Sequence, residues 1–238
     1  MSRPDNRSLD FPAGKQAGKQ AVHNAMRLDI EALIGPAAGA LTQHGWYVQE
    51  NAVPKALVAL LRADFARLLN QDRLKRAGIG RERTFQLARQ IRRDWIFWLS
   101  RSRNAHRVLL DQLECLRLAL NRNLFLALFE FEAHFALYPP GAFYRRHFDS
   151  FRGASNRMVS LVLYLNDSWQ EADGGELLLY HPKSGLEMAR VAPRAGTLVL
   201  FLSEEIEHEV AQTRVDRASV SAWFRLNGNV GEVLDPPR

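Results

Sequence analysis

Cysteine is almost absent from this sequence. The 238 residues contain one cysteine, Cys115, so no disulfide can form within the chain, and this favours a reducing compartment. No apolar run approaches the roughly 20 residues needed to cross a bilayer. The N-terminal stretch MSRPDNRSLDFPAGKQAGKQ lacks the apolar core of a signal peptide. We therefore expect a cytoplasmic protein with no membrane association.

Acidic residues are fewer than basic ones. Lys and Arg total 32 against 26 Asp and Glu, which gives a formal net charge of +6. The basic residues cluster at Arg73–Arg83 and Arg89–Trp95. Such a charge suits an acidic partner, whether nucleic acid, an anionic metabolite or an acidic protein face, but it also serves solubility alone. The composition, 47% hydrophobic and 24% charged, is that of an ordinary globular domain.

The first half of the chain has helical periodicity and no internal repeat. Apolar residues recur at helical spacing in 54–71 and 105–125, which predicts two amphipathic helices. Residues 26–45 predict one or two short helices broken at GPAAG, because Gly and Pro interrupt helices. Two short strands are expected, at 45–51 and 94–99.

From about residue 126 the apolar residues alternate with a period of two. Clusters of Gly, Pro, Asp and Ser separate the alternating segments. Several short strands at this spacing predict a sandwich or barrel, with the preceding helices supporting one face. The predicted strands are 128–138, 157–166, 175–180, 196–202 and 218–227.

These patterns predict a single domain with tails. Residues 1–25 are polar and are expected to form a disordered tail. Residues 26–125 should form a helical support with early strands and a mobile substrate loop at about 73–83. Residues 126–228 should form the β-rich catalytic core, and 229–238 a C-terminal tail.

A pair of potential metal ligands lies in YPPGAFYRRHFDS, residues 138–150. His147 and Asp149 are two residues apart, so an extended backbone would place both on one face. Alone, such a pair is a weak signal. His208, between two predicted strands, is the best candidate for a third ligand. Two histidines and one carboxylate form the facial triad of non-haem Fe(II) oxygenases, which leaves positions open for a co-substrate and O2.

An arginine follows His208 by nine residues and opens the last long predicted strand. A guanidinium inside a barrel is costly unless it is paired. Arginine binds a carboxylate through two parallel hydrogen bonds, so a bound dicarboxylic acid would be a suitable partner. Alternation gives this face no acidic side chain and places four residues on it: Arg217, Ser219, Ser221 and Trp223.

The order His-x-Asp, distal His and then Arg resembles that of the 2-oxoglutarate- and Fe(II)-dependent dioxygenases. More narrowly, the sequence is similar to the prolyl 4-hydroxylases of the hypoxia-inducible-factor type and their bacterial relatives. The resemblance covers about residues 45–228 and implies a mainly β fold: a double-stranded β-helix, or cupin-like jelly-roll, with N-terminal helices packed on the major sheet. It rests on IRRDWIFWL, YPPGAFYRRHFD, VLYLNDSW, GGELLLY and HEVAQTRVDRASVSAWF.

The resemblance also implies a role for each matched residue. It makes the three candidate ligands, His147, Asp149 and His208, ligands of Fe(II). Arg217 and Tyr164 would hold the distal carboxylate of 2-oxoglutarate, with Tyr138 near its metal-bound end. The resemblance further implies that Arg157 and Trp223 contact the substrate peptide. It also implies that Arg92 and Asp94 lie beside the mobile loop that closes over the substrate.

The implied activity is hydroxylation of a prolyl residue in a protein, with 2-oxoglutarate and O2 as co-substrates of the Fe(II) centre. Ascorbate is a further cofactor that the resemblance suggests, and the hypoxia-related members suggest oxygen sensing. The bacterial relatives suggest a translation factor, elongation factor Tu, as the substrate. The loop at 73–83 is shorter and more basic than in the animal enzymes, so their substrate is not carried over. A monomer is compatible with all these features.

Two other functions are compatible with part of the pattern. A related oxygenase or demethylase acting on nucleic acid or a small molecule would suit the basic charge. Against nucleic acid, the matches at Arg92, Arg157 and Trp223 are of the peptide-binding type. A non-catalytic metal-binding sensor module would need only the fold. The complete ligand set together with Arg217 argues against that alternative.

Overall fold

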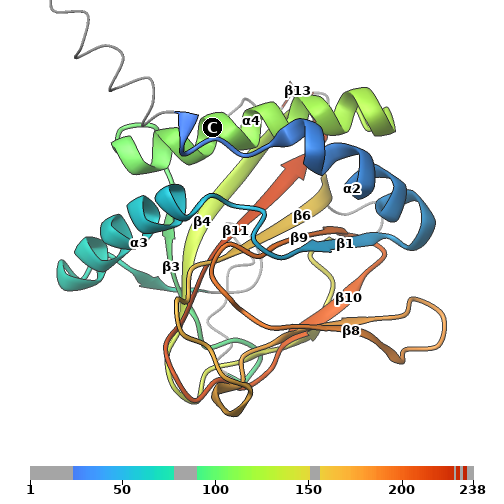
Figure 1. Ribbon diagram of the computed structural model, residues 1–238. Coiled ribbons are helices and arrows are strands. Elements are labelled where there is room, and N and C mark those ends of the chain that lie inside the picture. The colour runs from blue at the N-terminus through green and yellow to red at the C-terminus, as the bar shows by residue number, and fades with distance from the viewer. Residues whose placement is uncertain (1–23, 78–89, 151–155, 228, 231–232, 235–238) are drawn as a thin grey trace, which may run out of the picture.

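The computed structural model describes residues 24–77, 90–150, 156–227, 229–230 and 233–234. It consists of two antiparallel sheets that face each other, with three helices over the outer face of the larger sheet (Figure 1). This arrangement confirms the predicted double-stranded β-helix with helical support. None of the described helices is both long and apolar enough to span a bilayer.

The larger, major sheet has seven strands, and its central strand is the last long strand of the chain. Strand β11 pairs with β6 on one side and with β4 on the other. In spatial order, the strands are β1 (Trp46–Gln49), β9 (Leu198–Leu202), β6 (Arg157–Tyr164), β11 (Arg217–Arg225), β4 (Glu130–Tyr138), β3 (Trp95–Trp98) and β2 (Lys75–Arg76).

The smaller, minor sheet has four strands and completes the barrel below the major sheet (Figure 1). Its strands, in spatial order, are β5 (Tyr144–His147), β10 (Glu207–Val210), β7 (Leu177–Tyr180) and β8 (Glu187–Val191). A short 3-10 helix, η2 (Glu171–Asp173), precedes β7. Sequence periodicity predicted β7 but not β5, β8 or β10.

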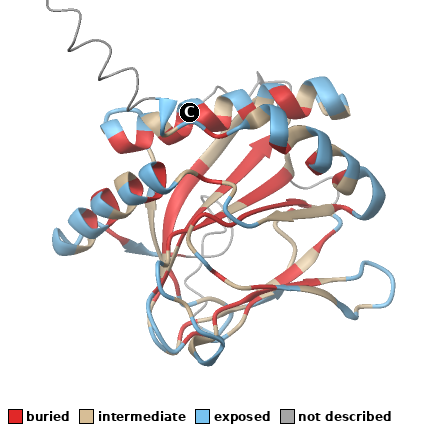
Figure 2. Cartoon of the chain, in the orientation of Figure 1, coloured by how far each residue is buried: buried red, intermediate tan, exposed pale blue. Residues whose placement is uncertain are grey.

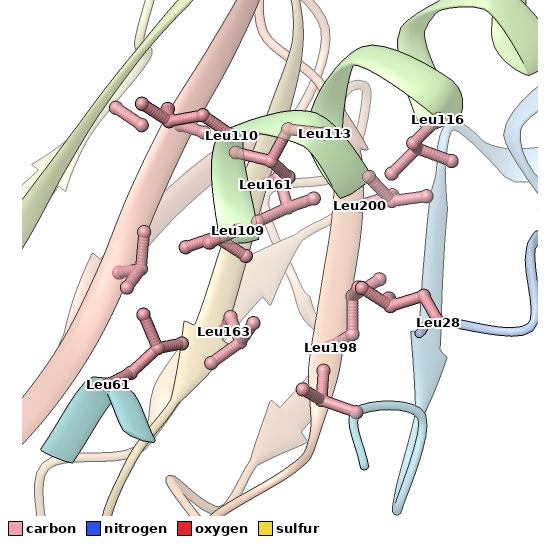
Figure 3. Packing of buried hydrophobic residues seen from close by; sticks show 14 of the residues in the cluster. Leu28, Leu61, Leu109, Leu110, Leu113, Leu116, Leu161, Leu163, Leu198 and Leu200 are labelled. Atoms are coloured by element: carbon pink, nitrogen blue, oxygen red, sulfur yellow. The ribbon is translucent and has the colours of Figure 1, made fainter. Parts of the chain in front are cut away.

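The inner strands of the major sheet, β6, β9 and β11, are largely buried, which explains their long apolar stretches. Figure 2 shows buried residues along these strands and along the inward sides of the helices. One face packs against the helices α2 (Ile30–His44), α3 (Lys55–Asn70) and α4 (Asn104–Leu124). In Figure 3, leucines of α4 such as Leu109 and Leu113 lie over Leu161 and Leu163 of β6. The opposite face is turned toward the minor sheet and lines the interior of the barrel.

Helix α2 corrects one sequence prediction, because it runs unbroken through the GPAAG segment. Asp29 caps its start by accepting a hydrogen bond from the Ala32 N–H, and Gly45 ends it in a left-handed conformation. Pro36 lies inside the helix and cannot donate a backbone hydrogen bond. The apolar face of the helix, which includes Leu33 and Leu41, is buried in the core, and this packing outweighs the local propensity.

Two tail and loop predictions meet the structure only in part. The predicted disordered tail falls on residues 1–25, of which 1–23 lie outside the described residues. Within the predicted mobile loop, Lys75–Arg76 instead pairs with β3, and 78–83 lie outside the described residues. The predicted C-terminal tail contains a small two-stranded sheet, β12 (Asn229–Val230) with β13 (Val233–Leu234).

Candidate metal and co-substrate site

The three predicted metal ligands lie together at one end of the minor sheet. His147 ends β5 and His208 lies in β10, where the two residues are direct partners across the sheet. Asp149 follows β5. One potential ligand atom from each residue lies within 4.8 Å of the others. The Nε2 atoms of His147 and His208 are each 3.7 Å from an oxygen of the Asp149 carboxylate.

Backbone carbonyls set the orientation of both imidazoles. Nδ1 of His147 is 2.7 Å from the carbonyl oxygen of Arg145, and Nδ1 of His208 is 3.2 Å from that of Ile206. When each Nδ1–H donates to its carbonyl, each Nε2 keeps a lone pair directed toward Asp149. Nε2 of His147 is buried and has no hydrogen-bond partner in the described chain. A divalent metal ion would satisfy it.

The charges of the cluster also suit a metal ion. Burial and the neighbouring His147 lower the pKa of His208 to about 4, so this imidazole is neutral at pH 7. Burial alone would raise the pKa of Asp149, but His208 and His147 hold it well below its usual range. Two imidazole nitrogens and one carboxylate are a suitable donor set for Fe(II) and leave coordination positions open.

Tyr144 has a structural role that sequence reasoning did not find. Its ring stacks on the His147 imidazole, with ring centroids 3.5 Å apart and planes at 17°. The Arg92 guanidinium lies 4.4 Å from the centre of the Tyr144 ring, and Arg92 makes two hydrogen bonds to the buried Asp94. The predicted substrate residues Arg92 and Asp94 are therefore linked to the predicted ligand His147 through the Tyr144 ring. The sequence around Tyr144 carries no signal of this stacking.

Arg217 is a buried cation on the inner face of the major sheet. It is 2% exposed, and its Nε donates to the carbonyl oxygen of Gly175 at 2.6 Å. Its guanidinium also lies 3.3 Å from the Ser219 hydroxyl. In the part of the chain that the structure describes, no Asp or Glu side chain pairs with it. An anionic ligand would complete this site.

Two tyrosines lie on either side of Arg217. The guanidinium carbon is 4.9 Å from the centre of the Tyr138 ring and 5.0 Å from that of Tyr164. Burial raises the pKa of both phenols, so both remain protonated donors. The Tyr164 hydroxyl is buried without a hydrogen-bond partner in the described residues. Together with Arg217, it provides donors for one end of a dicarboxylic acid.

The metal cluster and the anion site line the same interior. Tyr138 and Tyr164 belong to the buried cluster between the two sheets, which also contains Phe201. The Phe201 ring centroid is 4.5 Å from that of His208. An elongated dianion could therefore have one end at the metal ligands and the other at Arg217. The described structure thus has groups suited to bind a metal and, beside it, a chelating co-substrate.

The other two predicted substrate residues contact each other. The Arg157 guanidinium lies 3.8 Å from the centre of a Trp223 ring and pairs with Glu132. The Trp223 indole N–H is buried without a hydrogen-bond partner in the described chain. Next to Trp223 lie His134 and then Trp98, a half-exposed indole that sequence reasoning did not single out. These residues form an aromatic row on β11, β4 and β3.

Comparison with known proteins places this geometry in a family. Residues 133–225 match the sequence model of the 2OG-Fe(II) oxygenase superfamily, a description that confirms the predicted use of Fe(II) and 2-oxoglutarate. A crystal structure of a Pseudomonas putida prolyl-4-hydroxylase is 42% identical. The match covers 82% of this chain and 99% of that chain, with a TM-score of 0.74.

Two further relatives are more distant. A Trichoplax adhaerens prolyl hydroxylase, solved with a peptide fragment of hypoxia-inducible factor, is 22% identical over 91% of this chain and 94% of that chain. Its TM-score of 0.75 shows the common fold. The hypoxia-inducible factor prolyl hydroxylase of Caenorhabditis elegans is 24% identical over 86% of this chain, which spans 30% of that protein. From the family match and the close similarity to a solved bacterial enzyme, this chain belongs to the prolyl 4-hydroxylases of the 2-oxoglutarate- and Fe(II)-dependent oxygenase superfamily.

Proposed function

We propose that this chain is an Fe(II)- and 2-oxoglutarate-dependent dioxygenase that hydroxylates a prolyl residue of a protein. One observation carries the proposal: a largely buried His-Asp-His cluster shares the barrel interior with a buried arginine that no described carboxylate neutralises. The first group provides ligands for a metal, and the second provides a counter-charge for a dicarboxylic acid. A metal-binding module without a co-substrate would have no need of Arg217.

In this proposal, Nε2 of His147, Nε2 of His208 and the Asp149 carboxylate hold the Fe(II). Bound Fe(II) would supply the oxidation of an unactivated C–H bond by O2, while 2-oxoglutarate loses CO2 and becomes succinate. The Arg217 guanidinium and the Tyr164 hydroxyl hold the distal carboxylate of 2-oxoglutarate through charge-assisted hydrogen bonds. Tyr138 and Phe201 border the co-substrate with apolar rings, which exclude water from the interior.

We further propose that the substrate is a protein segment that presents a proline beside Trp223. The Trp223 indole is itself only 8% exposed, but the aromatic row continues through His134 to the half-exposed Trp98, and this row gives an apolar surface against which a prolyl ring can pack. Arg157 stacks on the Trp223 indole. The Trichoplax adhaerens relative also supports a peptide ligand, because it was solved in complex with a peptide fragment. Elongation factor Tu, a cytoplasmic translation factor, is the specific substrate that we propose to test.

The protein substrate is tested by mass spectrometry. Purified chain with Fe(II), 2-oxoglutarate and O2 should release succinate and add one oxygen to a proline of elongation factor Tu. His208→Ala should abolish both products, since it removes a metal ligand. Release of succinate without a modified proline would exclude elongation factor Tu and leave the oxygenase chemistry intact. Absence of succinate with every protein and nucleic acid tried would contradict the proposed activity.

The substrate class is tested by trapping. Asp149→Ala should bind substrate without turning it over, and proteins captured from a lysate by this variant can be identified. A captured protein whose proline gains one oxygen from the wild-type chain supports the proposal. Capture of oligonucleotides alone would support the nucleic-acid demethylase instead.

We also propose that residues 26–228 function as one domain. The first described strand of the chain, β1, pairs with β9, and α2 and α4 pack together over the same core. This connectivity ties the helical support directly to the β-rich half that carries the ligands.

A further inference from the structure

Two buried serines lie behind the Asp149 carboxylate. The Ser160 hydroxyl, on β6, donates a hydrogen bond of 2.6 Å to Oδ2 of Asp149. The Ser203 hydroxyl, just after β9, lies 2.9 Å from that of Ser160. Ser160 is 1% exposed and Ser203 is 0% exposed. Buried hydroxyls are costly unless they are hydrogen-bonded, so this pair needs an explanation.

The direction of these hydrogen bonds follows from the donors available. An ionised carboxylate only accepts, and a serine hydroxyl has a single hydrogen to donate. Ser160 uses its hydrogen on Asp149, so its oxygen must accept from Ser203. The result is a relay from Ser203 to Ser160 to Asp149. Each hydroxyl in the relay has an acceptor because the last member, the ionised Asp149 carboxylate, accepts a hydrogen bond and donates none.

The relay distinguishes the two oxygens of Asp149. In the described chain, Oδ2 accepts the one hydrogen bond made to this carboxylate. Oδ1 lies 3.7 Å from Nε2 of His147, which is too long for a hydrogen bond. Oδ2 likewise lies 3.7 Å from Nε2 of His208. Both oxygens therefore face a candidate ligand atom, and in the described chain only Oδ2 is held by a serine hydroxyl.

We propose that Ser160, supported by Ser203, is a positioning residue of the metal centre. It holds the Asp149 carboxylate through Oδ2 and so fixes the orientation in which this carboxylate faces the two imidazoles. This inference rests on the proposed metal site and goes beyond it, because neither serine contacts the metal or the substrate.

Ser203 also ties the ligand segments together through its backbone. Its N–H donates to the carbonyl oxygen of Met158 on β6, and its carbonyl oxygen accepts from the N–H of Ser150, next to Asp149. The chain then continues through one turn to His208. A single residue thus links the ligand loop after β5, strand β6 and the approach to the distal histidine. This places the relay where it can fix the carboxylate relative to the imidazoles.

The test measures Mn(II) binding to the metal-free protein by electron paramagnetic resonance, without any substrate. Hydrogen-bond partners of metal ligands typically contribute about 10- to 100-fold in affinity. We expect Ser160→Ala to raise the Mn(II) dissociation constant by about tenfold or more. Ser160→Thr keeps the hydroxyl and should stay within about threefold of wild type. Ser203→Ala, which removes only the outer donor, should fall between these two.

Comparing Ser160→Ala with Ser160→Thr separates the effect of the hydroxyl hydrogen bond on Mn(II) affinity from the effect of changed side-chain packing. Thermal unfolding of each metal-free variant reports any loss of fold stability on its own. Wild-type Mn(II) affinity in Ser160→Ala would overturn the inference, whatever its melting temperature. Equal losses in Ser160→Thr and Ser160→Ala would also overturn it, because the hydroxyl would then be irrelevant.

Two further variants keep this test separate from the proposed function. Asp149→Ala and His208→Ala should lose Mn(II) binding, because each removes a ligand. If they lose binding while Ser160→Ala does not, the relay is wrong and the metal site stands. If they bind Mn(II) as wild type does, the metal site is wrong, and the inference about Ser160 is overturned with it.

Discussion

At the scale of single residues, the barrel interior contains groups that only a ligand would satisfy. Arg217 is buried without a carboxylate partner in the described chain, and the Tyr164 hydroxyl beside it has no hydrogen-bond partner there. Leaving polar groups in this state costs free energy in the ligand-free protein. The same groups then favour a ligand of matching charge, because binding removes the cost.

Substitution of Arg217 tests this directly. Arg217→Ala should weaken 2-oxoglutarate binding on the order of 100-fold, the usual loss for one partner of a buried charge pair. Arg217→Lys should recover part of the affinity, since an ammonium keeps the charge but not the two parallel hydrogen bonds. Calorimetric titration with 2-oxoglutarate under anaerobic conditions measures both. Mn(II) affinity should not change, and unchanged 2-oxoglutarate affinity in Arg217→Ala would contradict the assignment.

His134 is a buried histidine whose lowered pKa should make the stability of the fold depend on pH. Burial first, and then the Arg92 charge, lower the pKa of His134 to about 4. An unfolded histidine takes up a proton below about pH 6.5, and the native one does so only near pH 4. The contribution of His134 to the free energy of unfolding should therefore fall as pH drops through this window, by on the order of 3 kcal/mol, and stay constant above it.

His134→Phe should flatten this dependence. The phenyl ring keeps the contacts with Trp98 and Trp223 and removes the titrating group. Urea unfolding between pH 4 and 8, with a chelator present, gives the two curves whose difference reports His134. Parallel curves for wild type and His134→Phe would show that this histidine does not set acid stability.

At the scale of elements, helix α2 shows where local propensity and packing conflict. Gly39 is exposed inside the helix, and a Cβ added there would meet no atom within 4 Å. Gly39→Ala should therefore raise the free energy of unfolding by about 0.5–1 kcal/mol. Gly35→Ala should gain less, because residue 35 precedes Pro36 and the pre-proline position disfavours helical dihedrals for residues with a Cβ.

Gly174 provides the opposite case. It has a φ of 66°, and a Cβ there would lie 2.4 Å from the carbonyl oxygen of Gln212. Gly174→Ala should destabilise the protein by more than Gly39→Ala stabilises it. Denaturant unfolding of the two variants, measured side by side, gives the sign of the change in the free energy of unfolding for each. A loss of stability in Gly39→Ala would contradict the expectation that helix α2 accepts a side chain at this position.

The elements that could be predicted most clearly from the sequence are those with a marked apolar pattern. Strands β4, β6, β9 and β11 carry long apolar stretches, and the amphipathic helices α3 and α4 show a clear period. The minor-sheet strands β5, β8 and β10 are only four or five residues long and carry charged side chains. Their pairing depends on distant partners, which periodicity does not encode.

The candidate site also contains some residues that could be predicted from the sequence and some contacts that could not. His147, Asp149, His208 and Arg217 could be predicted, because their order and spacing along the chain are distinctive. The stacking of Tyr144 on His147 could not be predicted, because it depends on the local course of β5 and on the conformations of two side chains. The serine relay could not be predicted, because it joins three segments that are separated in the sequence. Trp98 was missed because one more tryptophan in a strand carries no signal of exposure.

At the scale of the whole molecule, the proposed metal would join the two sheets. His147 and His208 belong to the minor sheet, while Asp149 is hydrogen-bonded to β6 of the major sheet. Mn(II) at 100 times its dissociation constant should stabilise the wild-type fold by about 2.7 kcal/mol, since a ligand that binds only the native state shifts the equilibrium. Differential scanning calorimetry should show the rise in melting temperature. His208→Ala should show none, and an equal rise in that variant would place the metal elsewhere.

The central position of β11 has a consequence for synthesis of the chain. This strand fills the gap between β4 and β6, yet it is made after all the other strands of both sheets. Until it emerges from the ribosome, β4 and β6 each present an open edge, and unpaired edges invite pairing with other chains. Arg217 arrives on the same strand. A nascent chain therefore cannot bind its co-substrate before the major sheet closes, and the last step of folding is also the step that makes the site complete.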